Sequence, residues 1–237
     1  MGKSAGGTSI ELSLIADLAC PWCYLGLVRL DRARALRPGL SVQLRWWPFL
    51  LNPQMPPEGM DRQAYLRAKF GGNANAKSVY ARILEAAAAD GVAFAFERMP
   101  KTPNTLRAHR LILLAERRGL ADPMIRSFFQ ALFVDGRDIG DPDQLIALAA
   151  AVGLDSSEVE SYLAGSRGAS EVVAGHRRAE ALGVRGVPVF VVDREHAIAG
   201  AQPPEVLVGL LDLAAATRQA PADAISETTG LGCGSTV

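Results

Sequence analysis

The stretch Cys20-Pro21-Trp22-Cys23 carries the strongest signal in this sequence. It directly follows an alternating run of apolar and polar residues at 10–17, which is typical of a half-buried strand. A helical pattern then extends from Pro21 to about residue 37, and proline is favoured at the first position of a helix. The pattern therefore places Cys20 at the helix N-cap, where a strand gives way to a helix.

A cysteine at a helix N-cap faces backbone N–H groups that have no partner within the helix, and these donors together with the helix dipole favour a thiolate. Cys23 lies one turn further along, close enough to form a disulfide with Cys20 and to release a mixed disulfide. Two buried structural cysteines, or two ligands of a zinc site, are the alternatives. A closed zinc site needs four ligands, and no second pair with suitable spacing is present, so we expect no metal. We predict that Cys20 is the nucleophile and Cys23 the resolving thiol, with Pro21 and Trp22 tuning the redox potential.

Composition limits the class of protein further. The chain has 237 residues, with 25 Lys+Arg against 25 Asp+Glu and a formal net charge of zero. A chain of this length folds without a disulfide or metal staple, and nucleic-acid binders usually have a basic excess. No window resembles a membrane span or a signal peptide, and three cysteines exclude a small disulfide-rich secreted protein. We therefore expect a cytoplasmic protein with no nucleic-acid or membrane partner.

The predicted order of elements is β-α-β, a helical block of roughly 120 residues, and then α-β-β-α. A second strand at 41–50 follows the first helix, so strands 10–17 and 41–50 are expected to be a parallel pair joined by a crossover helix. Residues 187–192 are predicted as a short buried strand, with 196–199 returning beside it in a hairpin. The two ends of the chain would then build one small α/β layer.

Local signals also predict where individual helices of the middle block begin. Asp122-Pro123, Asp141-Pro142 and Asp155 each have the pattern of an N-cap followed by a helix, and Asn104 or a neighbour begins another. The one convincing strand pattern in this block is the short apolar run at 92–96.

The dipeptide Val187-Pro188 is the second chemical signal. A proline inside a central strand would lose a ladder hydrogen bond, so Pro188 fits the exposed start of its strand with a cis peptide bond. An ordinary trans proline at a junction of loop and strand fits the residues equally well.

Four separated segments of the chain resemble the DsbA family of thioredoxin-like proteins, and in particular its cytoplasmic FrnE-like branch. That branch is described as dithiol-disulfide isomerase-like and is related to 2-hydroxychromene-2-carboxylate isomerases and kappa-class glutathione transferases. The similarity spans about residues 10–215. The segments are Asp17-Leu18-Ala19-Cys20-Pro21-Trp22-Cys23-Tyr24-Leu25-Gly26, Pro48-Phe49-Leu50-Leu51-Asn52-Pro53, Asn104-Thr105-Leu106-Arg107-Ala108-His109-Arg110-Leu111 and Gly200-Ala201-Gln202-Pro203-Pro204-Glu205.

The resemblance implies an α/β protein with a thioredoxin-like fold that carries a large helical insertion, as in DsbA. Residues 10–60 and 184–217 would form a discontinuous thioredoxin-like domain. Residues 61–183 would be the helical insertion, and residues 218–237 a flexible tail.

The resemblance also implies a function. In this family the proline that matches Pro188 is cis and packs against the cysteine pair, so Pro188 and the backbone of Val187 are expected to hold a substrate beside Cys20. The implied activity is that of a protein-disulfide oxidoreductase or isomerase, monomeric or homodimeric, that acts on a disulfide-containing protein or a small thiol. It would need no cofactor beyond an external thiol reductant or oxidant such as glutathione or thioredoxin.

Two other functions stay open. One is a glutathione-dependent isomerase or transferase; those relatives typically have Ser at the position of Cys20 and lack a resolving cysteine, so the presence of both cysteines favours disulfide exchange. The other is a redox-regulated chaperone that uses the helical insertion as a binding surface.

The remaining polar candidates are less specific. His109 shares a helix face with Thr105, where it is either a structural residue or a substrate-binding residue over Cys20. Asp17 is expected to be a solvated acid at a strand end, although it lies three residues before Cys20. His176 is expected on a helix surface, and Cys233 has no second cysteine near it and is expected to be an idle exposed thiol.

Overall fold

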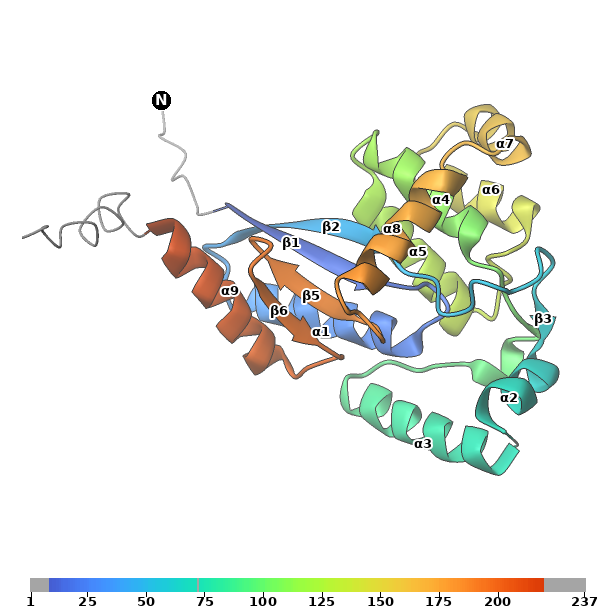
Figure 1. Ribbon diagram of the computed structural model, residues 1–237, viewed down its shortest axis with the longest axis horizontal. Helices are drawn as coiled ribbons and strands as arrows, with labels where there is room; N and C mark the ends of the chain where they lie inside the picture. Colours follow the sequence, from blue (N-terminus) through green and yellow to red (C-terminus); the bar gives the residue numbers. More distant parts are fainter. Residues whose placement is uncertain (1–8, 72, 220–237) are drawn as a thin grey trace, which may run out of the picture.

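The computed structural model of the chain describes residues 9–71 and 73–219 (Figure 1). Its centre is a four-stranded sheet with the order β2-β1-β5-β6, formed by β1 (Ser9–Ala16), β2 (Ser41–Pro48), β5 (Val189–Val192) and β6 (His196–Ala199). The strands therefore come from the two ends of the described chain. The described residues end at 219. Cys233, and all of the expected flexible tail at 218–237 except its first two residues, therefore lie outside them.

The first strand, helix and strand form as the local pattern predicts. Helix α1 (Pro21–Ala35) has Pro21 at its first position, and β1 and β2 are parallel with Leu14 opposite Trp46. Strand β5 pairs antiparallel with β1 and with β6, so the predicted hairpin is also confirmed. A parallel pair needs a crossover connection, and α1 supplies it.

Alternation along the strands gives the sheet two buried faces. One face, with Leu12, Leu14 and Phe190, belongs to the main core, to which α1 and the last helix α9 (Pro204–Gln219) also contribute. The opposite face carries a smaller cluster in which Ile15 packs with Ala179 of α8. Successive strand residues point to opposite sides, so neighbouring residues of β1 serve different cores.

Between β2 and β5 the chain is mainly helical (Figure 1). Its helices are α2 (Arg62–Phe70), α3 (Asn73–Ala89), α4 (Leu106–Glu116), α5 (Ala121–Phe133), α6 (Pro142–Ala151), α7 (Ser156–Ala164) and α8 (Ala169–Ala181). The predicted caps at Asp141 and Asp155 are confirmed, since each carboxylate accepts a backbone N–H of the first turn. Asn104 similarly accepts from the backbone N–H of Leu106 at the start of α4. Within the described ranges no helix is both long and apolar enough to cross a bilayer.

Two local predictions in this block are wrong. Helix α5 begins at Ala121, not after Asp122, and the Asp122 carboxylate instead accepts a hydrogen bond from Arg126 one turn later. Pro123 then occupies the first turn, where a missing N–H costs no intrahelical bond. The apolar run 92–96 is not a strand, because its aromatic side chains pack into the core and no neighbouring strand pairs with it. The block instead contains a two-residue ladder between β3 (Met60–Asp61) and β4 (Lys101–Thr102).

Candidate active site

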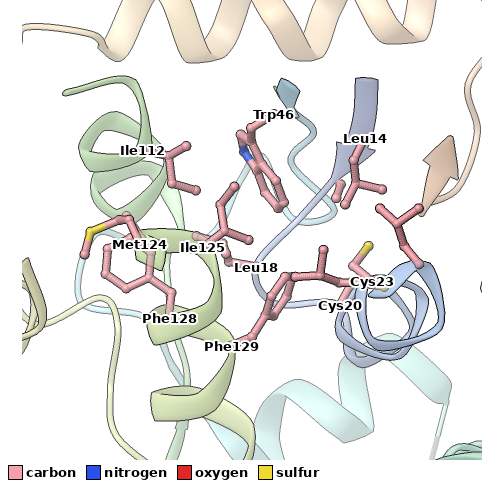
Figure 2. Close-up of a cluster of buried hydrophobic side chains, with 14 of the residues drawn as sticks. Leu14, Leu18, Cys20, Cys23, Trp46, Ile112, Met124, Ile125, Phe128 and Phe129 are labelled. Atoms are coloured by element: carbon pink, nitrogen blue, oxygen red, sulfur yellow. The ribbon is translucent and has the colours of Figure 1, made fainter. Parts of the chain in front are cut away.

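The two cysteines lie at the beginning of α1, where the sequence places them. Cys20 is the N-cap with an extended backbone (φ −100°, ψ 110°), and its carbonyl accepts the N–H of Cys23 at 3.0 Å. Figure 2 shows both sulfur-bearing side chains close together at the edge of the hydrophobic core. Cys20 is 4% exposed and Cys23 is fully buried. Of the two cysteines, Cys20 is therefore the one with some exposed surface.

The environment of Cys23 keeps its thiol protonated. Burial raises the pKa of Cys23 well above its ordinary value, and the hydrogen bond and charge of Cys20 raise it further. Cys20 instead lies at the N-terminus of α1, where the helix dipole favours negative charge. The two thiols of one motif thus differ in their surroundings, since Cys23 is fully enclosed and Cys20 lies at the helix N-terminus.

The strand that begins after Pro188 reaches the cysteines from the far end of the chain. The peptide bond Val187–Pro188 is cis, which confirms the cis alternative and excludes the ordinary trans proline. The Sγ atom of Cys20 lies 3.6 Å from the carbonyl oxygen of Val187. The carbonyl of Pro188 accepts the N–H of Gly200 at 2.8 Å, so the turn after β6 fixes this proline beside the motif.

Gly26 allows Pro188 to come this close to α1. A Cβ atom at Gly26 would lie 3.1 Å from Pro188 Cγ and 3.1 Å from Phe190 Cζ, which is tighter than ordinary contact. Glycine thus lets the helix that carries the cysteines pack directly on the proline and on the strand that follows it.

A cavity of about 190 Å³ opens beside Cys20. Pro21 and Trp22 form part of its wall, and the helices that follow β2 supply most of the rest. Its further lining includes Arg62, Tyr65, Lys69, Phe70, Tyr80, Thr102 and Phe133. The lining is mainly apolar, and α2 contributes four of these residues. No residue of α2 is predicted from the sequence to belong to the site, because a short polar helix has no pattern that points to one.

Asp17 lies at the end of β1, but the prediction of a solvated acid is wrong. Its side chain is 1% exposed. One carboxylate oxygen accepts the N–H of Leu51 at 2.7 Å, and the other accepts the N–H of Ala19 at 3.2 Å and contacts Nε2 of His109 at 3.3 Å. The carboxylate therefore lies under the cysteine motif with several partners.

The hydrogen bonds fix the tautomer of His109. Trp46 donates its indole N–H to Nδ1 of His109 at 3.0 Å, and an indole nitrogen can only donate. Nδ1 is therefore unprotonated, so Nε2 carries the proton and donates a hydrogen bond to the carboxylate of Asp17. Burial alone would raise the pKa of Asp17, but the hydrogen bonds from His109 and from the N–H of Leu51 hold that pKa below its ordinary value.

The structure places the candidate His109, and also His176, away from the cavity wall. His109 is fully buried, so it has no surface to offer a substrate and instead supports Asp17 beneath the site. His176 is 6% exposed and is not a surface residue. Its ring lies edge-on to Phe49, and its Nδ1 accepts the N–H of Leu50 at 3.3 Å. In the described part of the chain no cluster of His, Cys, Asp and Glu has the form of a metal site.

Comparison with known proteins finds a family model and several solved structures that match this chain. Residues 11–212 match the family model of the DSBA-like thioredoxin domain. The crystal structure of a probable DsbA oxidoreductase from Streptomyces coelicolor is 34% identical, with a TM-score of 0.76 over 90% of this chain and 92% of that chain. The cytosolic disulfide reductase DsbM from Pseudomonas aeruginosa, solved with GSH, is 22% identical, with a TM-score of 0.61 over 86% and 98% of the two chains.

A 2-hydroxychromene-2-carboxylate isomerase has 16% identity and a TM-score of 0.63, over 88% of this chain and 97% of that chain. At this identity, and at that of DsbM, the likeness extends to the fold alone.

Proposed function

We propose that this chain, which belongs to the DSBA-like thioredoxin domain family, is a thiol–disulfide oxidoreductase that works through Cys20 and Cys23. One observation carries the proposal: Cys20 lies at the N-terminus of α1, beside a cavity and against the carbonyl of Val187, while Cys23 is enclosed one turn behind it. A nucleophile needs access and a stabilised thiolate, and a resolving thiol needs only proximity.

The proposed reaction has two exchange steps. The Cys20 thiolate attacks one sulfur of a substrate disulfide, forms a mixed disulfide and releases the other half as a thiolate. Cys23 then loses its proton and attacks the Cys20 sulfur, which releases the second half and leaves a Cys20–Cys23 disulfide. The substrate gains two electrons and the enzyme dithiol loses two. Two equivalents of an external thiol such as glutathione, or one dithiol such as thioredoxin, would restore the enzyme.

The first step itself prepares Cys23 for the second. The negative charge and hydrogen bond of Cys20 are among the causes that raise the pKa of Cys23. Once Cys20 is part of a mixed disulfide, that charge is gone, and the pKa of Cys23 falls when its thiolate is needed. In this proposal Cys23 stays protonated before the mixed disulfide forms. It loses its proton more readily once the negative charge of Cys20 has gone.

The surrounding residues take supporting roles in this proposal. Pro188 and the backbone of Val187 position the substrate against Cys20, and Pro21 and Trp22 tune the redox balance. We further propose that residues 10–60 and 184–217 form the redox domain, since both contribute to the sheet and the motif. Residues 61–183 then supply the cavity wall, through α2 in particular. A cytoplasmic location fits a reductant-dependent enzyme, and the neighbour DsbM is named as cytosolic.

The variant Cys23→Ser tests the dithiol route, with Cys20→Ser as the matched control. Reduction of insulin disulfides should be lost in both variants. Only Cys23→Ser should accumulate a covalent adduct on Cys20, because the mixed disulfide forms but has no resolving thiol. Intact mass under non-reducing conditions detects this adduct. Full turnover of Cys23→Ser with glutathione and no adduct would instead favour a glutathione-dependent isomerase or transferase.

A further inference from the structure

Arg62 is a buried cation that has no ion-pair partner within residues 9–71 and 73–219. It is the first residue of α2 and is 8% exposed, and its guanidinium lies over the rings of Tyr80 and Phe96 at 5.0 Å and 5.3 Å. Among the residues that the structure describes, no carboxylate forms an ion pair with it. The aromatic rings offset part of the cost of burying the charge, but they leave its fork of N–H donors free.

Asp61 precedes Arg62 in the chain, and Glu97 lines a second cavity that Arg62 also borders, but both acids have other contacts. The carboxylate of Asp61 caps α2 by accepting the N–H of Ala64 at 2.8 Å. Glu97 lies 3.9 Å from the guanidinium of Arg98. A buried charge normally has a paired countercharge, so the missing partner of Arg62 is a feature that requires an explanation.

The cavity beside Cys20 offers an explanation, because Arg62 forms part of its wall. Of the residues that the structure describes, Arg62 and Lys69 are the charged ones in this wall, and no Asp or Glu among them lines it. The Nζ atom of Lys69 contacts only neutral acceptors, the carbonyl of Leu51 and the side chain of Asn52. Another lining residue, Thr102, has a buried hydroxyl with no hydrogen-bond partner in the described structure. The cavity thus combines apolar walls with unpaired positive charge.

We propose that this cavity binds one arm of a small disulfide that carries a carboxylate, and that Arg62 selects for that carboxylate. The size fits: a cavity of about 150 Å³ can hold benzene, and this one measures about 190 Å³. A planar guanidinium fork matches a carboxylate in two parallel hydrogen bonds. This inference rests on the proposed exchange at Cys20, where attack forms the bond to the bound sulfur and breaks the substrate S–S bond.

A series of three small disulfides tests the selectivity in the wild-type enzyme. 3,3′-Dithiodipropionate is acidic, 2-hydroxyethyl disulfide is neutral and cystamine is cationic, and their chains are of similar length. We expect kcat/KM to fall at least tenfold from the acidic to the neutral disulfide after correction for their intrinsic reactivity with dithiothreitol, and further for cystamine. Equal or inverted ranking overturns the inference, whether or not any variant folds.

The variant Arg62→Gln then tests whether Arg62 causes the preference for the acidic disulfide, with Arg67→Gln as the matched control. Arg67 belongs to the same helix but is exposed and does not line the cavity. Arg62→Gln should lose at least tenfold in kcat/KM for dithiodipropionate and less than twofold for the neutral disulfide, and Arg67→Gln should change neither. An equal loss on both disulfides would show a merely structural role. Arg62→Lys keeps the charge without the fork and should lose an intermediate amount.

A binding measurement separates this inference from the proposed function. The Cys20→Ser protein cannot exchange disulfides, but its cavity should still bind 3-(methylthio)propionate at least tenfold more tightly than the neutral amide of that acid. The fluorescence of Trp22, which lines the cavity, reports the binding. Selective binding in a protein whose wild type reduces no disulfide would refute the proposed function alone. Disulfide reduction without selective binding would refute the role of Arg62 alone.

Discussion

Replacing His109 with leucine should destabilise the protein strongly at neutral pH, because His109 satisfies two buried partners at once. It accepts the indole N–H of Trp46 and donates to the carboxylate of Asp17. Leucine is of similar size but has no polar atom. The variant therefore leaves the indole N–H without an acceptor and takes one hydrogen bond from a buried charge.

The size of the effect follows from these two losses. An unsatisfied buried donor costs about 1–3 kcal/mol, and a hydrogen bond to a charged group contributes about 1.5–3 kcal/mol. Asp17 keeps its bonds from the backbone N–H groups of Ala19 and Leu51, so its carboxylate is not left without partners. We expect the free energy of unfolding at pH 7 to fall by about 3–5 kcal/mol, a large part of the usual stability of a domain.

The pH dependence identifies the source of this loss. In the wild type the pKa of Asp17 lies below its ordinary value of 3.8. A lowered pKa contributes stability that is complete above the unfolded value and is lost as the pH falls through the folded value. His109→Leu removes part of that contribution, so its deficit relative to the wild type should be largest at pH 7 and should shrink below about pH 4.

Urea denaturation followed by circular dichroism measures these differences, and Trp46→Phe supplies the matched control. In the double variant with His109→Leu no orphaned indole N–H remains, so the combined loss should be smaller than the sum of the single losses by about 1 kcal/mol or more. A deficit below about 1 kcal/mol at pH 7, or one that stays constant from pH 7 to pH 3.5, would refute this account of the network.

Two further predictions concern the motif and its packing. Iodoacetamide labelling near neutral pH, followed by peptide mapping, should modify Cys20 well before the buried Cys23, and the reverse order would contradict the proposed roles. Gly26→Ala should reduce disulfide-reductase activity and lower stability by about 1–3 kcal/mol, because the added Cβ would crowd Pro188 and Phe190 at 3.1 Å each. Unchanged activity and an unchanged unfolding midpoint would show that this packing tolerates a methyl group.

Much of the fold was predictable because its signals are local. The strand before the motif, Pro21 at the first helical position, and the caps at Asp141 and Asp155 each depend on a few consecutive residues. The thioredoxin-like fold class and the resemblance to the DsbA family are likewise confirmed. The misplaced start of α5 shows the limit of such signals, since Asp122 has a competing partner in Arg126 one turn further along.

The burial of polar residues could not be predicted in the same way. Asp17 follows a strand and precedes a helix, a position that usually faces solvent. It is buried because Leu51 and His109, far along the chain, supply its hydrogen bonds. Arg62 is a stronger case, because neither of the two arginines in this short polar helix is marked by the sequence as the one that aromatic rings will enclose. The burial of both residues depends on contacts that exist only after the chain has folded.

The four segments that carry the family resemblance meet at one place. The first contains the cysteines and Asp17, the second supplies the N–H of Leu51, and the third supplies His109, all around one carboxylate. The fourth begins with Gly200, whose N–H holds the carbonyl of Pro188. Segments separated by most of the chain therefore support the same two thiols from below and from the side. The lining of the cavity that α2 supplies lies outside all four segments, so the proposed chemistry and the proposed choice of substrate would depend on different parts of the sequence.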